Sequence, residues 1–461
     1  MTLWHGRLSG GTADVVVDYS FSIHYDQRLA KDDIIGSRAH VRGLGRGGLL
    51  SADEVTQLLG ALDAVEAELE GGTFAFEPDD EDIHTAVERR VTELAGDVGA
   101  KLHTGRSRND QIATDLRLYA KRELAAIASA VLGLQDVLVV RAKEAGDTYL
   151  PGYTHMQRAQ PVLLAHHLLA HGWALARDVD RLVATVARLD VSPLGAGALA
   201  GSSLPLDPDG TGADLGFAGR FENSLDAVSD RDFVAEALFD LALLGVHLSR
   251  IGEEIVLWST EEFGFAVLDD AYATGSSMLP QKKNPDVAEL ARGKSGRLIG
   301  NLTGLLVTLK GLPLAYNRDL QEDKEPFFDS VDQSALALAA LSGLLATVAF
   351  DTNRMQDAAN GSSVAAVDLA EWLVEQGMPF RQAHSVVGGL VHDSLERHVP
   401  LAELVEAHPA LGSEAVALLE PGVAVTRRTT PGSAGPAAVA VQLGRFAHRL
   451  EADRFRLQAM A

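Results

Sequence analysis

The sequence contains no cysteine. Disulfide bonds, zinc–thiolate sites and iron–sulfur clusters are therefore excluded. It also has no run of about 18 uninterrupted apolar residues, so we expect no membrane-spanning segment. The first residues, Met-Thr-Leu-Trp-His-Gly-Arg, lack the apolar core of a signal peptide. These absences lead us to expect a cytoplasmic protein with no role in a membrane.

Basic residues are scarce relative to acidic ones. Forty Lys and Arg stand against 64 Asp and Glu, which gives a net charge of -24 and disfavours binding to nucleic acids or anionic membranes. An anionic substrate would therefore need a local pocket of Lys and Arg. The hydrophobic content of 46% and the charged content of 23% are typical of a globular protein. A length of 461 residues exceeds one ordinary core, so two or three domains are expected.

Strand signals are few, and long helices rich in Ala, Leu and Val dominate the pattern. Residues 226–258 are the clearest case, because apolar residues recur there at alternating spacings of three and four, as in a helical bundle. Similar patterns cover residues 111–146, 161–190 and 285–310, and Pro161 opens the second of these. Helices of roughly 30 residues span about 45 Å. We therefore predict an all-α protein with an extended central bundle.

Shorter patterns flank the predicted bundle. We divide the chain into a mostly helical N-terminal domain (1–106), a central long-helix domain (107–350) and a small C-terminal helical domain (351–461). Within the central domain, residues 192–220 are rich in glycine and proline and should form an irregular excursion.

The most informative segment, residues 275–289, reads Gly-Ser-Ser-Met-Leu-Pro-Gln-Lys-Lys-Asn-Pro-Asp-Val-Ala-Glu. Asn284 is a good N-cap and Pro285 suits the first helical turn, so a helix start is predicted here. The free N–H groups of that helix and either of the two lysines can bind an anion, and the hydroxyl of Ser276 can swing over the same point. We interpret the segment as a carboxylate or phosphate site with a closing lid. An ordinary surface loop before a helix is the alternative.

A second polar segment, residues 101–111, precedes the first long helix. It combines Arg106, Arg108 and Asn109. Arginine offers bidentate donors that suit carboxylates, so the segment is a candidate recognition site. An exposed, capped helix start is the alternative.

A third segment, residues 150–161, places Thr154, His155 and Gln157 in a turn before a bundle helix. A loop histidine beside such side chains can shuttle protons. The alternative is a histidine that is hydrogen-bonded to the turn backbone.

His167 and His171 lie one helical turn apart, which is a spacing used by metal ligands. No carboxylate occupies the positions between them, and Leu168 and Trp173 are interleaved with the histidines. We therefore favour packing or helix-surface histidines and predict no metal site.

Two further clusters of polar residues could be functional, but each also has an ordinary structural explanation. The acidic residues of the segment 79–84 follow Pro78 and are typical of dipole compensation at a helix start. Asp82 and His84 are candidates for residues that support a site without contacting its ligand. Residues 316–326 are unusually dense in polar side chains. A solvated loop is the alternative there.

Taken together, these segments resemble the fumarase/aspartase superfamily and, within it, the argininosuccinate lyase family. Residues 275–284 are similar to the superfamily signature Gly-Ser-Ser-x-Met-Pro-x-Lys-x-Asn. The resemblance to the narrower family rests on residues 103–111, 152–161, 229–234 and 316–324, and it runs from about residue 4 to the end.

The chain departs from the family pattern at three places. Met278-Leu279 stands in the lid where another residue and then Met are usual. The N-terminus reads Trp4-His5-Gly6-Arg7-Leu8 where Trp-Gly-Gly-Arg-Phe is usual, and the stretch from Pro431 to Pro436 replaces the usual Gly-Gly-Thr-Ala-Pro. The last two concern local folding more than chemistry.

The resemblance implies a reversible anti elimination that splits argininosuccinate into L-arginine and fumarate, the last step of L-arginine biosynthesis. Ser276 would be the base on the lid. His155, oriented by Glu289, would be the second catalytic group, with Thr154 near the departing guanidinium. Lys282, Asn284 and the following helix start would stabilise the carboxylate on which charge builds. No cofactor or metal is implied.

The resemblance also assigns substrate-binding positions and an assembly. The binding positions would be Ser22, Arg108, Asn109, Arg231, Tyr316, Gln321 and Lys324. The family fold has three domains, and its long helices form a 20-helix bundle in a homotetramer in which three subunits form each site.

The length of the predicted helix 111–146 also bears on the assembly, independently of the family. Asn109 lies at one end of the predicted helix 111–146, and His155 lies just past the other end, about 50 Å away. Both cannot line one pocket within a single chain. If both are site residues, the site must be built from several chains.

Two other functions remain open. The first is another fumarate-releasing lyase, such as adenylosuccinate lyase, and the segments 103–111 and 316–324 favour argininosuccinate instead. The second is a structural protein on the same scaffold, as with the lens crystallins of this family. The joint presence of Ser276, His155, Lys282 and Glu289 favours an enzyme.

Overall fold

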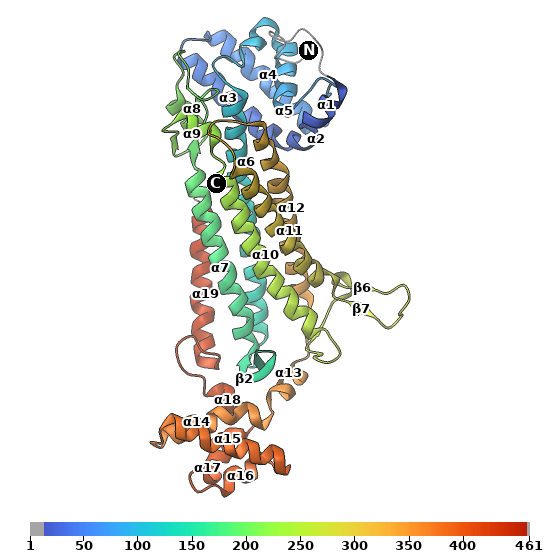
Figure 1. The fold of residues 1–461 in the computed structure, drawn as a ribbon, viewed down its shortest axis with the longest axis vertical. Coiled ribbons are helices and arrows are strands. Elements are labelled where there is room, and N and C mark those ends of the chain that lie inside the picture. The colour runs from blue at the N-terminus through green and yellow to red at the C-terminus, as the bar shows by residue number, and fades with distance from the viewer. Residues whose placement is uncertain (1–12, 459–461) are drawn as a thin grey trace.

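The computed structural model describes residues 13–458 of the chain. The predicted helical architecture is confirmed: short helices at one end, a long bundle in the middle and a small cluster at the other end make an elongated molecule (Figure 1). The predicted departure at Trp4–Leu8 lies outside the described residues.

The N-terminal end consists of short helices whose starts follow from the sequence. Ser51 begins α4 with a capping box, because its side chain accepts from the N–H of Glu54 while the Glu54 carboxylate accepts from the N–H of Ser51. Asp82 caps α5 in a similar way, accepting from the N–H of Thr85 across 2.7 Å. The helices here are α1 (Asp14–Ser20), α2 (Ile23–Asp26), α3 (Ala30–Arg46), α4 (Ala52–Glu70) and α5 (Ile83–Ala95).

The bundle is built from long helices that share one apolar core. They are α6 (Arg108–Glu144), α7 (Leu164–Leu189), α10 (Asp232–Trp258), α11 (Asp286–Leu309), α12 (Lys324–Thr347) and α19 (Pro436–Gln458). The 37 residues of α6 span about 55 Å, so this helix runs nearly the length of the bundle. By length and composition, α6 and the segment Arg318–Thr347 could each cross a membrane, but α6 is a core helix of the bundle and α12 packs against it.

Short elements connect the bundle helices. The predicted excursion at 192–220 contains little regular structure, as expected. The connecting elements are β1 (Tyr149–Thr154) paired with β2 (Gln157–Leu163), β3 (Val191–Ser192) with β4 (Gly219–Arg220), β5 (Ala266–Val267) with β8 (Ala349–Phe350), β6 (Thr274–Gly275) with β7 (Lys283–Asn284), and the helices α8 (Pro208–Asp214) and α9 (Ser224–Ser229).

Two helix boundaries differ from the prediction, and one helix was missed. The pattern at 226–258 is two helices, because the chain leaves the helical conformation at Asp230 and Arg231. Pro161 does not open a helix but lies in β2, opposite Pro151 of β1. The helix α12 was not predicted, because the dense polar segment before it reads as a loop.

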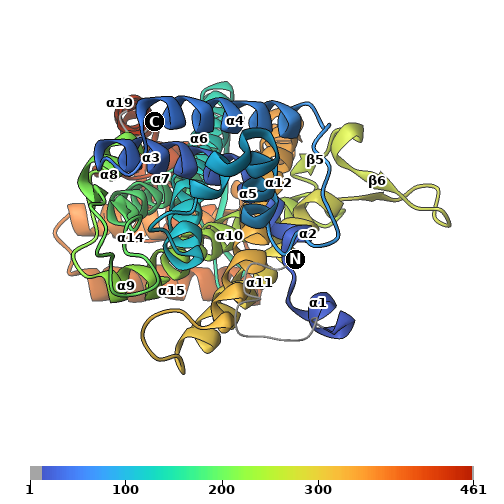
Figure 2. The same ribbon diagram turned by 90° about the horizontal axis from the view of Figure 1, so that it is seen from above.

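The capping role predicted for Asn284 is wrong, although the helix begins within one residue of the predicted position. Asn284 pairs with Thr274 in the β6–β7 ladder, and α11 begins two residues later at Asp286. The ladder closes the loop 276–282, and Figures 1 and 2 show that this loop projects sideways from the bundle. Backbone pairing therefore replaces side-chain capping at this point.

The small cluster at the far end has its own apolar core. It follows α13 (Thr352–Ala359) and contains α14 (Ala366–Glu375), α15 (Phe380–Arg397), α16 (Leu401–Ala407), α17 (Gly412–Val416) and α18 (Val423–Thr426). The last helix, α19, leaves this cluster and packs against α6 and α7. The predicted boundary between the central and C-terminal domains at residue 350 stays a prediction. The helix α19, which was assigned to the C-terminal domain, lies in the bundle.

Candidate active site

Six of the predicted substrate-binding residues line one cavity of about 320 Å³ at the N-terminal end of the bundle. They come from three distant parts of the chain, which the fold brings together around the start of α6. The six are Ser22, Arg108, Asn109, Tyr316, Gln321 and Lys324.

The start of α6 fixes two of these side chains. Ser107 caps the helix, since its Oγ accepts from the N–H of Asn109 across 3.2 Å while Asp110 accepts from the N–H of Ser107 across 2.9 Å. Arg108 and Asn109 therefore stand in the first turn, where a positive helix end and a guanidinium lie side by side. The predicted helix start is confirmed, and the same turn also lines the cavity.

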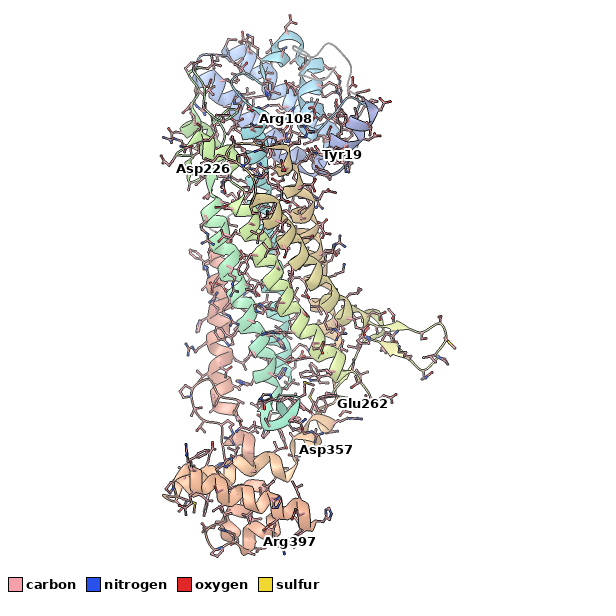
Figure 3. All side chains as sticks on the ribbon, in the orientation of Figure 1. Tyr19, Arg108, Asp226, Glu262, Asp357 and Arg397 are labelled. Carbon is pink, nitrogen blue, oxygen red and sulfur yellow. The ribbon has the colours of Figure 1, made fainter. Side chains whose placement is uncertain are left out.

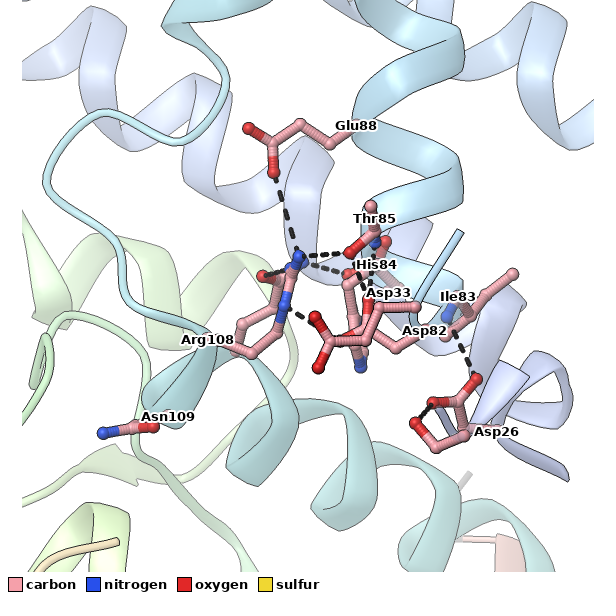
Figure 4. Close-up of polar contacts among 12 residues, drawn as sticks. Asp26, Asp33, Asp82, Ile83, His84, Thr85, Glu88, Arg108 and Asn109 are labelled. Carbon is pink, nitrogen blue, oxygen red and sulfur yellow. Dashed lines mark hydrogen bonds and ion pairs between the residues drawn. The ribbon is translucent and has the colours of Figure 1, made fainter. Parts of the chain in front are cut away.

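Arg108 is held from several sides (Figure 4). It donates to Oε1 of Gln111 across 2.6 Å and to Oγ1 of Thr85 across 3.1 Å, and it pairs with Asp82 across 3.1 Å. Burial by itself raises the pKa of Asp82, but the charges of Arg108 and His84 lower it below its ordinary value. The carboxyl group of Asp82 is therefore ionised at neutral pH.

A buried ionic cluster lies behind Arg108. Nδ1 of His84 lies 3.0 Å from Asp33 and 3.2 Å from Asp115, and all three side chains are at most 1% exposed. Burial lowers the pKa of His84, but the charge of Asp33 and the hydrogen bonds outweigh it and raise the value to about 10. Gln111 also donates to Asp33, so the imidazolium is linked through Asp33 and Gln111 to Arg108.

A second buried cluster joins two predicted binding residues. Nε of Arg231 donates to Asp323 across 2.5 Å, and Nζ of Lys324 donates to the other oxygen of Asp323 across 2.8 Å. Arg231 lies behind the cavity, whereas Lys324 lines it. The side chains of Arg231 and Asp323 have no exposed area.

The cavity also holds negative charge. Ser22 donates to Asp26 across 2.5 Å, and Arg318 pairs with Glu81 across 2.7 Å. Both carboxylates and cations therefore line the cavity, the carboxylates being Asp26, Glu81 and Asp82 and the cations Arg108, Arg318 and Lys324. Such a wall suits a ligand that carries both carboxylates and a cationic group.

Thr154 and His155 lie at the opposite end of α6, in the β1–β2 hairpin. His155 and Met156 form its two-residue turn, with positive φ values of 55° and 58°. Side chains rarely adopt this conformation, although the tightest hairpin turns require it. The predicted turn is confirmed, and it presents the exposed imidazole of His155 beside a second cavity of about 630 Å³.

The remaining predicted residues belong to the projecting loop and its base. Oγ of Ser276 accepts from the backbone N–H groups of Met278 and Leu279 across 3.2 and 2.9 Å. Lys283 is paired with Asp270 across 2.6 Å, whereas Lys282 has no ion pair within residues 13–458. Met278 is 86% exposed and Leu279 is 44% exposed, so the residues that depart from the family pattern touch little of their own chain.

Asn284 and Glu289 flank the start of α11. The amide of Asn284 reaches Thr274 and the carbonyl of Gly275 across 3.4 Å each. Glu289 is half exposed, with Arg292 at 3.9 Å. Across the described part of the chain, no hydrogen bond or ion pair joins Glu289 to His155.

The predicted site residues thus fall into three separate groups. Arg108 lies near the upper end in Figure 3, the hairpin lies at the lower end of the bundle, and the loop projects from its side. The chain brings together the members of each group but not the three groups.

Sequence reasoning missed several residues of the N-terminal cavity. Asp26, Thr85 and Arg318 line it, and Asp323 lies beneath Lys324. Arg318 and Asp323 belong to the polar segment 316–326, whose density was the signal that could have found them. Asp26 and Thr85 gave no comparable signal.

Comparisons with known proteins agree along nearly the whole chain. A family model for lyases matches residues 6–300, and a model for the argininosuccinate lyase C-terminal region matches residues 363–426. Argininosuccinate lyase of Saccharopolyspora erythraea is 53% identical, over 95% of this chain and 93% of its own length. That of Frankia casuarinae is 52% identical, over 98% of this chain and 99% of its own length.

Solved structures extend the comparison to the fold. EDDS lyase in complex with formate has a TM-score of 0.85 and 31% identity, and the match covers 98% of this chain and 93% of that one. Class II fumarase from Schistosoma mansoni has a TM-score of 0.76 at 15% identity, covering 89% and 94%, so it shares the fold.

Proposed function

This chain belongs to the argininosuccinate lyase family, and we propose that it splits argininosuccinate reversibly into L-arginine and fumarate at sites that three subunits share. The observation that carries the shared site is the separation of three groups of residues on one chain. The reaction is an anti elimination that breaks a carbon–nitrogen bond, and it is the last step of L-arginine biosynthesis.

The N-terminal cavity is the binding half of the proposed site. Argininosuccinate carries carboxylates as well as a guanidinium and an amino group. Arg108 and Lys324 would bind carboxylates, with bidentate geometry available to the arginine. Asp26, Glu81 and Asp82 would face the cationic parts of the substrate. Ser22, Asn109, Tyr316 and Gln321 would add neutral hydrogen bonds, while Arg231 would act from behind Asp323.

Ser276 would remove the proton next to a substrate carboxylate. A serine hydroxyl is a poor base unless its alkoxide is stabilised. The N–H groups of Met278 and Leu279 already point at Oγ, and donors to the charged form favour that form. This turn supports the assignment of Ser276 as the base.

When the proton is removed from the substrate carbon, negative charge develops on the neighbouring carboxylate. Lys282 carries a positive charge with no internal partner among residues 13–458, so it is available to that carboxylate. The amide of Asn284 and the free N–H groups at the start of α11 can add fixed donors. Closure of the loop over a bound substrate would bring these groups together in a dry site.

The leaving guanidinium needs a proton, and the hairpin of a further subunit would supply it. His155 or Thr154 would act there, with Glu289 of a different subunit orienting the imidazole. The two-residue turn keeps His155 exposed at the tip of the hairpin, where its imidazole would be accessible to a neighbouring subunit.

The exposed face of α11 supports assembly of the bundle into a homotetramer. Gly293, Gly296, Gly300 and Gly304 lie along that face, and a Cβ added at any of them would meet open space. A glycine inside a helix costs about 1 kcal/mol relative to alanine, so four on one face call for a compensating contact. Leu306 and Val307 are also more than half exposed beside them. Close packing against the long helices of other copies, in a 20-helix core, would account for both features.

We place the enzyme in the cytoplasm as a small-molecule lyase without a nucleic-acid or membrane partner. The test is a fumarate assay, followed as ultraviolet absorbance, on the purified full-length protein. Argininosuccinate should give fumarate, whereas adenylosuccinate should not. Fumarate from adenylosuccinate alone would support the sister lyase, and an inert tetramer would support a structural protein.

A further inference from the structure

Two histidines on one face of α7 meet a carboxylate from α10. Nε2 of His167 lies 2.6 Å and Nε2 of His171 lies 2.7 Å from the same oxygen of Glu254. The three ligand atoms all lie within 4.8 Å of one another. The sequence showed only the two histidines, because the carboxylate comes from a residue more than 80 positions along the chain.

Packing holds the imidazoles in this arrangement. The ring of His167 lies 4.9 Å from the ring of Trp258 and 5.7 Å from that of His171, measured between centroids. The histidines are mostly buried, with side-chain exposures of 24% and 16%. Little reorganisation would therefore be needed to bring both Nε2 atoms to one point.

Carboxylate oxygens and imidazole nitrogens are both ligands of zinc, which binds them at about 2.0–2.2 Å. One carboxylate and two imidazoles therefore form a suitable ligand set for zinc and related ions.

We propose that His167, His171 and Glu254 form an accessory binding site for a divalent transition-metal ion, with Zn²⁺ as the best match to the ligand set. Spacing of the histidines by four residues on a helix places both rings on one side, as in helical zinc sites. Small ligand movements would open the two hydrogen-bond contacts to the separations that an intervening ion needs.

The open coordination positions face the cavity of about 630 Å³ that all three residues line. A site with three protein ligands leaves room for water or a small anion as the fourth ligand. The elimination needs no such ion, although His155 lines the same cavity, so the site lies beside a proposed catalytic residue. Occupancy by the ion can be measured directly, without an activity assay.

Cobalt is the spectroscopic probe for this site. The full-length protein is stripped with a chelator and titrated with Co²⁺, whose visible absorption reports low-coordinate nitrogen and oxygen ligation. We expect a saturable band at one ion per chain, which added Zn²⁺ abolishes. Wild-type protein without a saturable band would overturn the proposal.

Three variants assign the ion to its ligands. His171→Ala and Glu254→Gln should each lose the band, and circular dichroism shows whether they fold. His166→Ala is the matched control, because His166 lies on the same helix but contacts Gln442 across 3.1 Å instead. A band that persists in either folded ligand variant would place the ion at other residues and contradict the site, so one folded variant is enough for the test.

Discussion

Lys324 donates a hydrogen bond to Asp323 across 2.8 Å, and neither side chain is more than 3% exposed. Arg231 occupies the other oxygen of the same carboxylate. Two cations therefore share one buried anion beneath the N-terminal cavity. Burial raises the pKa of Asp323, but the charges of Lys324 and Arg231 outweigh it and keep the carboxyl group ionised.

Replacing Asp323 by asparagine should weaken both folding and binding. The change leaves two buried cations without a partner, which costs on the order of 3–5 kcal/mol in the free energy of unfolding. KM for argininosuccinate should rise more than kcat falls, because Lys324 loses the contact that positions it at the cavity. Urea unfolding and steady-state kinetics measure both effects. The control variant Glu322→Gln removes an exposed charge at the preceding position and should change neither the unfolding free energy nor the kinetics.

The His84 cluster makes stability depend on pH in a definite direction. The pKa of His84 in the folded state, about 10, exceeds the ordinary histidine value of 6.5. The contribution to stability is therefore fully present below about pH 6.5 and is lost as pH rises through about 10. The difference in unfolding free energy between wild type and His84→Gln should shrink over that window. A pH-independent difference would contradict the charged form of His84, and the exposed His24→Gln serves as control.

Ser276→Ala should remove the base and leave the fold unchanged. General bases contribute roughly 10²–10⁴-fold to rate, so kcat should fall by about that factor with little change in unfolding temperature. Ser277→Ala changes the neighbouring hydroxyl of the same exposed loop and should retain most activity. Equal loss in both variants would mean that the loop matters only as a lid.

Gly300→Leu tests the exposed face of α11. The added side chain meets open space within the chain, so each chain should still fold. It should nevertheless block close approach of another helix, so sedimentation should show smaller species and most of the activity should disappear. Gly388→Leu also points into open space, on α15 outside the bundle, and should leave assembly intact.

The long helices could be predicted because their apolar spacing is a local property of the sequence. Patterns at 111–146 and 161–190 correspond to α6 and α7 within a few residues. The cap of α11 could not be predicted, because Asn284 is a good cap in isolation but pairs with Thr274 across a loop. Pairing with a strand on the other side of a loop cannot be predicted from the residues next to Asn284.

The site residues likewise divide into those that local sequence reveals and those that depend on tertiary contacts. Arg108, Asn109, Tyr316 and Lys324 could be named from polar segments and family motifs, and one cavity does contain them. Asp323 beneath that cavity and Glu254 beside two histidines could not be assigned, because their roles depend on contacts between distant segments. Tertiary packing brings these carboxylates to their partners, and it cannot be read from the local sequence.

The central claim is that no single chain holds a complete active site, and subunit exchange tests it most directly. His155→Asn and Ser276→Ala are each expected to be inactive alone. After dissociation and reassembly of an equal mixture, about one quarter of the sites should regain both wild-type groups from different subunits.

Fumarate formation from argininosuccinate is the measurement. Activity should return in the mixture but not when His155→Asn is mixed with the double variant His155→Asn/Ser276→Ala. Restored activity approaching a quarter of wild type is the result we predict. Persistent absence of activity in verified mixed tetramers would contradict the shared site.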